Sequence, residues 1–155
     1  MKTHKGISVL ISAQNDEKTV ELCAMSFFDF ADEIIIVTNG STDSTIDICA
    51  HLASRYSSKI RFYNQADLPD LHHNRSFAFS KSKYFWVFRC DADYVAYGNE
   101  DGDMSVSELR EILLNSSPLW PTAHFFKKVN LEGDLRHTAK YPIDTPPGKY
   151  VQMPP

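Results

Sequence analysis

Short apolar runs alternate with helical patterns along roughly the first 90 residues, and this alternation constrains the fold more than any other feature. The run at 33–37, Glu-Ile-Ile-Ile-Val, is apolar enough to be buried on both faces, as in a parallel sheet. The order β-α-β-α-β-α-β predicts an α/β fold, with a mostly parallel sheet, right-handed crossovers and flanking helices. We expect strands at 7–12, 33–37, 59–63 and 84–90, and helices at 17–28, 44–56 and 67–82.

The ends and the inner faces of the helices follow from capping residues and apolar spacing. Asn15 or Asp16 is expected to cap the first helix. A later helix at 105–114 begins with Ser105 and Glu108 at the spacing of a capping box. A strand at 124–131 and a hairpin turn at 132–134 come last. The residues expected to face the core are Val20, Cys23, Ala24, Phe27 and Phe28 in the first helix and Ile46, Cys49, Ala53 and Tyr56 in the second.

Length and charge limit the classes of protein and partner. A chain of 155 residues suits one domain, 1–155, with a sizeable core. Its 43% apolar and 23% charged residues are typical of a soluble globular protein. A net charge of −4 provides no basic footprint, so nucleic acid and anionic membranes are not expected partners.

The cysteines and the N-terminal segment indicate where the protein works. Cys23, Cys49 and Cys90 form no paired framework, and we expect reduced thiols in the core. The apolar run that follows the basic start is only about six residues, too short for a signal peptide or a transmembrane segment. These features predict a cytoplasmic protein.

The strongest candidate site is the pair of carboxylates at the end of the last predicted strand. The apolar run at 84–90 leads into Asp91 and Asp93, and residues at i and i+2 of a strand point to the same side. Two oxygen ligands there suit a divalent cation that also holds a diphosphate. A plain turn at the strand end is the alternative. A second pair, Asp101 and Asp103, lies in a polar stretch and is expected to be a solvated loop or a helix cap.

Four local motifs, in order, resemble the inverting family 2 glycosyltransferases. The first strand leads into Ser-Ala-Gln-Asn-Asp-Glu at 12–17, and Val-Thr-Asn-Gly-Ser-Thr-Asp-Ser-Thr at 37–45 is similar to the family signature. His-Asn-Arg-Ser at 73–76 matches the place of an Arg-Asn pair, and Cys-Asp-Ala-Asp at 90–93 looks like the Asp-x-Asp motif. The resemblance covers about residues 6–95.

The resemblance implies a GT-A (Rossmann-like) fold, with 6–95 as the nucleotide-sugar-binding half and 96–155 as a partial acceptor-side region, so that the sheet is expected to be truncated on its C-terminal side. It implies metal-dependent transfer of a sugar, with inversion, from a nucleoside diphosphate sugar (UDP-linked) to an unknown glycan, lipid or protein. Mn²⁺ or Mg²⁺ would be held by Asp91 and Asp93. No catalytic base stands out after Asp93. The implied nucleotide-sugar-binding residues are Ser12, Ala13, Asn15, Asn39, Arg75, Asp91, Ala92 and Asp93.

Physical reasoning supports this placement, because ligands of open α/β sheets bind at the carboxyl ends of the strands. Several residues keep a second interpretation. Asn39 can accept from uracil N3–H or donate, and Asn39-Gly40 can equally be a tight turn with a positive φ. Arg75 can face a diphosphate, hold Asp91 or face solvent, and Asn74 or His73 can replace it as the family counterpart. Ser41, Thr42 and Asp43 are expected to be helix caps rather than ligands.

Two other functions remain open on the sequence. A sugar nucleotidyltransferase of similar fold would need a Gly-rich, basic loop after the first strand, and Ser-Ala-Gln-Asn at 12–15 contains neither Gly nor Lys. A non-catalytic or incomplete nucleotide-binding α/β module would need no catalytic base.

Overall fold

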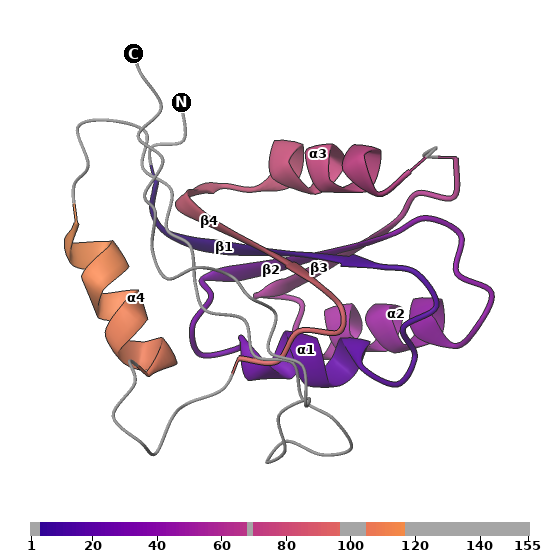
Figure 1. Cartoon of the computed structure of the whole chain (residues 1–155), viewed down its shortest axis with the longest axis horizontal. Coiled ribbons are helices and arrows are strands. Elements are labelled where there is room, and N and C mark those ends of the chain that lie inside the picture. The colour runs from indigo at the N-terminus through magenta and orange to yellow at the C-terminus, as the bar shows by residue number, and fades with distance from the viewer. Residues whose placement is uncertain (1–3, 68–69, 97–104, 117–155) are drawn as a thin grey trace, which may run out of the picture. The chain divides into compact units, whose positions relative to one another are not determined.

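The four predicted strands form one parallel sheet with helices on both faces (Figure 1). The computed structural model describes residues 4–67, 70–96 and 105–116, all of which lie in the compact unit Met1–Ser117. The predicted α/β class is confirmed. The elements are β1 (His4–Ala13), α1 (Val20–Ser26), β2 (Glu33–Thr38), α2 (Thr45–Arg55), β3 (Ile60–Asn64), α3 (Leu71–Lys81), β4 (Tyr84–Asp91) and α4 (Val106–Asn115).

The strand order β3-β2-β1-β4 places β1 between β2 and β4. β3 lies at an edge of this sheet, and most of its residues are accordingly only half-buried. The register brings the ends of the strands into line. Ser12 of β1 pairs with Val37 of β2 and with Asp91 of β4, and Val37 pairs with Tyr63 of β3. The carboxyl ends of all four strands therefore meet at one edge of the sheet, which we call the carboxyl edge.

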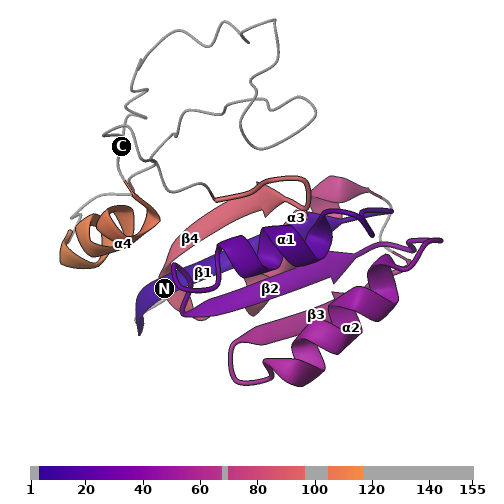
Figure 2. The ribbon, with the colours of Figure 1, turned by 90° about the horizontal axis from the view of Figure 1, so that it is seen from below.

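The main core lies on the face of the sheet that α1 and α2 cover (Figure 2). β1 and β2 contribute side chains to both faces, which explains why all residues of β2 are buried. Aromatic rings of Phe27, Phe30 and Phe88 pack together, with centroids 5.1 to 6.2 Å apart. The predicted inward residues Val20, Cys23, Ala24, Phe27 and Cys49 are buried, whereas Phe28, Ile46, Ala53 and Tyr56 are only partly buried and Leu52 is an additional core residue.

The opposite face, covered by α3, holds a smaller apolar cluster and more polar groups. Ala78 of α3 packs against Leu10, Ile35 and Val37. Nearer the amino ends of the strands, the buried Glu33 carboxylate accepts hydrogen bonds from the Ser8 hydroxyl at 2.7 Å and from the backbone N–H of Lys83 at 2.6 Å. These bonds attach the segment between α3 and β4 to the sheet.

Two helices begin later than the sequence predicts. α1 starts at Val20 rather than 17, and neither Asn15 nor Asp16 is its N-cap, because Thr19 occupies that position without a side-chain bond. α3 starts at Leu71 rather than 67, after Asp70, whose carboxylate accepts the backbone N–H of His73 at 3.0 Å. The predicted cap of the first helix is thus wrong.

α4 begins with the predicted capping box. The Ser105 hydroxyl accepts the Glu108 N–H at 3.1 Å, and the Glu108 carboxylate accepts the Ser105 N–H at 2.7 Å. Arg110 attaches the helix to the turn before β2, because its guanidinium donates to both carboxylate oxygens of Asp32, at 2.7 and 3.0 Å, and to the carbonyl oxygen of Phe30. The predicted strand 124–131, the turn 132–134 and the pair Asp101/Asp103 lie outside the described residues.

All three cysteines are free and buried, as predicted. Burial raises the pKa of the Cys49 thiol to about 12, so it stays protonated at neutral pH. Within the described ranges, no helix has the length and apolar character needed to cross a bilayer.

Candidate functional site

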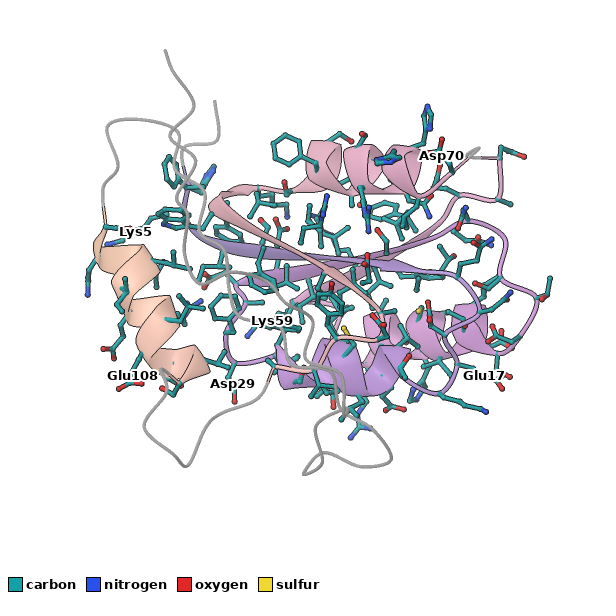
Figure 3. All side chains as sticks on the ribbon, in the orientation of Figure 1. Lys5, Glu17, Asp29, Lys59, Asp70 and Glu108 are labelled. Atoms are coloured by element: carbon teal, nitrogen blue, oxygen red, sulfur yellow. The ribbon has the colours of Figure 1, made fainter. Side chains whose placement is uncertain are left out.

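The polar residues selected from the sequence gather at the carboxyl edge. β1, β2 and β4 end at Ala13, Thr38 and Asp91, and the loops that follow carry the candidate ligands. Figure 3 shows Glu17 and Asp70 at this end of the sheet, and Lys5, Asp29 and Glu108 at the opposite end. The strands run one way and α3 runs back, so that the start of α3 also lies at the carboxyl edge.

Asp91 is the last residue of β4 and is held by Arg75 of α3. The Arg75 guanidinium donates to Asp91 Oδ1 at 2.6 Å, and the two side chains are 18% and 39% exposed. Three interpretations of Arg75 were open. The structure shows the contact with Asp91, and the side chain does not face solvent. One oxygen of Asp91 is oriented by this ion pair, and the carboxylate stays accessible from the edge.

Asp93 lies beyond the strand rather than on it. β4 ends at Asp91, and the Tyr94 N–H donates to the Asp91 carbonyl oxygen at 3.1 Å, which closes a turn around Ala92 and Asp93. Strand alternation therefore explains the direction of Asp91 only, and the turn sets the direction of the exposed Asp93 side chain. The turn given as the alternative to a ligand pair is therefore present, and it leaves the Asp93 side chain exposed.

The loops after β1 and β2 are joined by a ladder of hydrogen bonds. Asn15 Oδ1 accepts the Thr42 N–H at 2.8 Å, and the Asn15 N–H donates to Ser41 Oγ at 3.1 Å. The Asp16 N–H donates to the Thr45 hydroxyl at 2.8 Å. Asn15 adopts φ 59°, a left-handed conformation that Asn tolerates better than most residues. The Asn15 side chain is thus committed to the neighbouring loop.

The residues predicted as helix caps have different roles. Ser41 and Thr42 bind Asn15, as described above, and do not cap α2. Asp43 does bind the start of α2, because its carboxylate accepts the N–H and the hydroxyl of Thr45 at 3.0 and 2.6 Å. Gly40 adopts φ 77°, the positive φ that one of the two interpretations of Asn39-Gly40 required.

Ser12, Ala13 and Ala92 lie under this edge. All three are buried, and the Ser12 carbonyl oxygen accepts the Ala92 N–H at 3.2 Å. Ala13 and Ala92 belong to the core on the α1 and α2 face. Ser12 pairs with Asp91 and Val37, which places it on the α3 face of β1.

Three residues at the edge have buried polar atoms without a partner in the described part of the chain. They are the Oδ1 atom of Asn39, the Nε atom of Arg75 and both amide atoms of Asn74. A buried polar group without a hydrogen bond costs about 1–3 kcal/mol. Unsatisfied groups concentrated at one edge are an indication of a ligand site. Sequence reasoning had considered Asn74 only as a possible counterpart of Arg75.

Asp16 is a further acidic group that sequence reasoning did not assign to the site. Burial raises its pKa, and the negative charges of Asp93, Asp43 and Asp91 raise it further. The charges of Asp93, Asp43 and Asp91 therefore act on Asp16 at this edge.

The donor set fits a divalent cation shared with a ligand rather than a closed protein site. In the described ranges, no group of three or more His, Cys, Asp or Glu side chains is placed to hold a metal ion. Mg²⁺ is commonly held by one or two protein carboxylates together with substrate phosphates and water. Asp91 and Asp93 supply two carboxylates at an open edge, which suits this mode.

The sequence matches the family described as Glycosyl transferase family 2 over residues 8–104. This match covers more than half of the chain, and the protein belongs to that family. The matched residues include most of β1 and all of the other strands, which confirms the assignment to the nucleotide-sugar-binding half of the family fold. No curated protein matches the chain.

Several solved structures are similar to the chain. S. aureus TarS shares 23% identity at a TM-score of 0.45, covering 57% of this chain and 16% of that chain. S. aureus TarS 1-349 in complex with UDP-GlcNAc shares 22% identity at a TM-score of 0.46, over 57% and 26%. Glucosyl-3-phosphoglycerate synthase from Mycobacterium tuberculosis in complex with UDP shares 27% identity at 0.44, over 59% and 35%. The chain thus spans between 16% and 35% of the length of these three structures.

Proposed function

We propose that the carboxyl edge binds a UDP-linked sugar with a divalent cation, and that the chain serves metal-dependent, inverting sugar transfer to a glycan, lipid or protein acceptor. The observation that carries the proposal is the Asp91 carboxylate, which Arg75 holds at the end of β4 beside the turn that presents Asp93. Family membership supports the same chemistry. The buried, reduced thiols favour the cytoplasm as the site of action.

In this proposal Asp93 ligates the cation, Mn²⁺ or Mg²⁺, and Asp91 contacts the ribose or the metal shell. A cation bound there would neutralise charge on the leaving diphosphate. Arg75 orients Asp91 through the ion pair and supplies a positive charge next to the diphosphate. Burial raises the pKa of Asp16, and the negative charges of Asp93, Asp43 and Asp91 raise it further; the same charges would repel an unaccompanied diphosphate, which supports a role for the cation.

The nucleoside is proposed to lie against the ends of β1 and β2. The unpartnered Oδ1 atom of Asn39 can accept a hydrogen bond from uracil N3–H. Asn15 shapes the pocket through its bonds to Ser41 and Thr42, and Ser12, Ala13 and Ala92 form its floor through small side chains and backbone. No residue is proposed as the catalytic base.

A thermal-shift panel of nucleoside diphosphates, with and without Mn²⁺, tests the proposal. A ligand that binds only the folded state stabilises it by mass action and so raises the Tm. The gain in free energy of unfolding is about 2.7 kcal/mol at a ligand concentration of 100 times the Kd. We expect a shift with UDP plus Mn²⁺ that disappears with EDTA and in Asp93→Ala. Asp29→Ala is the matched control, because Asp29 is an exposed carboxylate at the opposite end of the sheet.

Two results would count against the proposal: no shift with any diphosphate, or the same shift in Asp93→Ala as in the parent chain. Release of pyrophosphate from a nucleoside triphosphate would instead favour a nucleotidyltransferase. Binding of UDP without hydrolysis of any UDP-sugar would favour a non-catalytic binding module.

A further inference from the structure

Asn74 is a fully buried polar side chain that the proposed function leaves unused. It has 0% exposure, and neither its amide nitrogen nor its amide oxygen has a hydrogen-bond partner within the described residues. Two unsatisfied polar atoms on one buried side chain reduce stability, and an apolar side chain of similar size would avoid this cost. A ligand that completes these hydrogen bonds would account for an amide at this position.

Asn74 lies near the start of α3, and this end of the helix is at the carboxyl edge. Ala78, one turn later in the helix, packs on Leu10, Ile35 and Val37 in the middle of the sheet. Because α3 runs opposite to the strands, Asn74 lies closer than Ala78 to the ends of β1 and β2, which α3 contacts. The next residue, Arg75, reaches Asp91 at that edge.

The chemistry of an amide selects one part of the proposed ligand. A carboxamide presents a donor and an acceptor side by side, and its bidentate complement is an adjacent acceptor and donor. The edge of a pyrimidine base has such a pair, for example O4 and N3–H of uracil, whose single N3–H would then donate to Asn74 in place of Asn39. A diphosphate offers acceptors only, and it would leave the Oδ1 atom of Asn74 unpaired.

We propose that Asn74 is a base-reading residue, whose amide makes a bidentate hydrogen-bonded contact with the edge of the nucleobase. This inference rests on the proposed function of the carboxyl edge. The amide is closed to solvent in the ligand-free chain, so binding of the base requires a local rearrangement that exposes it. Asn39 and Arg75 contribute single unpartnered atoms at the same edge, whereas Asn74 contributes both a donor and an acceptor.

Isothermal titration calorimetry with two probes, UDP and inorganic pyrophosphate, each with Mn²⁺, tests the inference. Asn74→Leu keeps the approximate volume but removes both polar atoms. We expect at least a tenfold loss of UDP affinity, pyrophosphate affinity within twofold of the parent chain, and an unchanged or higher Tm without ligand. Asn115→Leu is the control, because Asn115 is an exposed Asn at the end of α4.

The outcomes separate this inference from the function on which it rests. If the parent chain binds neither probe, the proposed function fails. If the parent chain binds UDP and Asn74→Leu binds it equally well, the base-reading role alone is wrong. A purely structural role predicts a lower Tm and a parallel loss of both probes, which would also overturn it.

If Asn74→Leu does not fold, NMR of the parent chain gives the same decision. The side-chain NH₂ resonances of Asn74 should shift on addition of UDP and Mn²⁺ and stay in place with pyrophosphate and Mn²⁺. Equal responses to both probes, or no response to UDP, would contradict the inference.

Discussion

At the scale of single residues, the carboxyl edge combines groups that are costly to keep in a folded chain. Asp16 lies among other carboxylates, Asn15 and Gly40 adopt positive φ, and Asn74 is buried without a partner. Such local costs are typical of binding sites, where they are retained for the ligand rather than for stability. Two substitutions measure them directly.

Gly40→Ala tests the turn after β2. A Cβ at this position would meet only Ala66 atoms at 3.9 Å, so crowding adds nothing and the cost is conformational. A left-handed conformation costs a non-glycine residue about 1–2 kcal/mol. We expect urea denaturation to show a loss of free energy of unfolding of that size, and a smaller loss for Gly40→Asn. A neutral Gly40→Ala would contradict the φ of 77°.

Asp16→Asn tests the negative potential at the edge. Because the pKa of Asp16 is raised, mainly by burial, ionisation destabilises the fold above that pKa, and the penalty vanishes below the ordinary aspartate pKa of 3.8, where the group is protonated in both states. We expect Asp16→Asn to be more stable than the parent chain at pH 7 and equally stable near pH 3. A variant that is less stable at pH 7 would contradict this expectation. It would show that the ionised Asp16 side chain contributes more to the stability of the fold than its ionisation costs.

At the scale of elements, the strands and the α3–β4 connection were predictable, but the starts of α1 and α3 were not. Apolar runs identify strands because burial on a sheet requires them. The start of α1 depends on Asn15 and Asp16, whose bonds go to residues 27 and 29 positions away in the second loop. Capping rules consider only neighbours in the sequence. They therefore cannot predict a helix start when Asn15 and Asp16 bond to residues far along the chain instead.

The attachment of α4 is a second feature that only the structure reveals. Although burial acts in the other direction, hydrogen bonds from Arg110 and from the Ile7 N–H hold the pKa of Asp32 below its usual value. The stabilisation is therefore present above the unfolded-state pKa of the carboxyl and is lost as pH falls through its folded value. We expect Arg110→Met to cost about 1 kcal/mol at pH 7.

Denaturant titrations at pH 7 and at pH 3 measure this effect. The difference between Arg110→Met and the parent chain should shrink at the lower pH, because protonation of Asp32 weakens its ion pair with Arg110 as the pH approaches the lowered pKa of the folded parent chain. Lys59→Met removes a partly buried cation that also lowers the pKa of Asp32, so its deficit should depend on pH in the same direction but to a smaller extent. A deficit that is independent of pH would assign the effect to lost packing by the Arg110 side chain.

At the scale of the whole molecule, the site follows from the topology. Parallel strands in register bring Ser12, Val37 and Asp91 to one edge, so motifs separated by up to 80 residues meet there. The sequence therefore predicts which residues gather. It leaves open whether Arg75 binds Asp91 and whether the strand ends in a turn, and it does not predict that Asn74 is unsatisfied, because these depend on the packing of α3 and on the geometry beyond β4.

The most direct test of the account is a crystal structure of the chain with UDP and Mn²⁺, with the metal located by anomalous scattering. We expect the Mn²⁺ peak next to the Asp93 carboxylate, the diphosphate across it, and the base at the ends of β1 and β2. Nucleotide bound elsewhere, or Mn²⁺ in contact with neither Asp91 nor Asp93, would contradict the account.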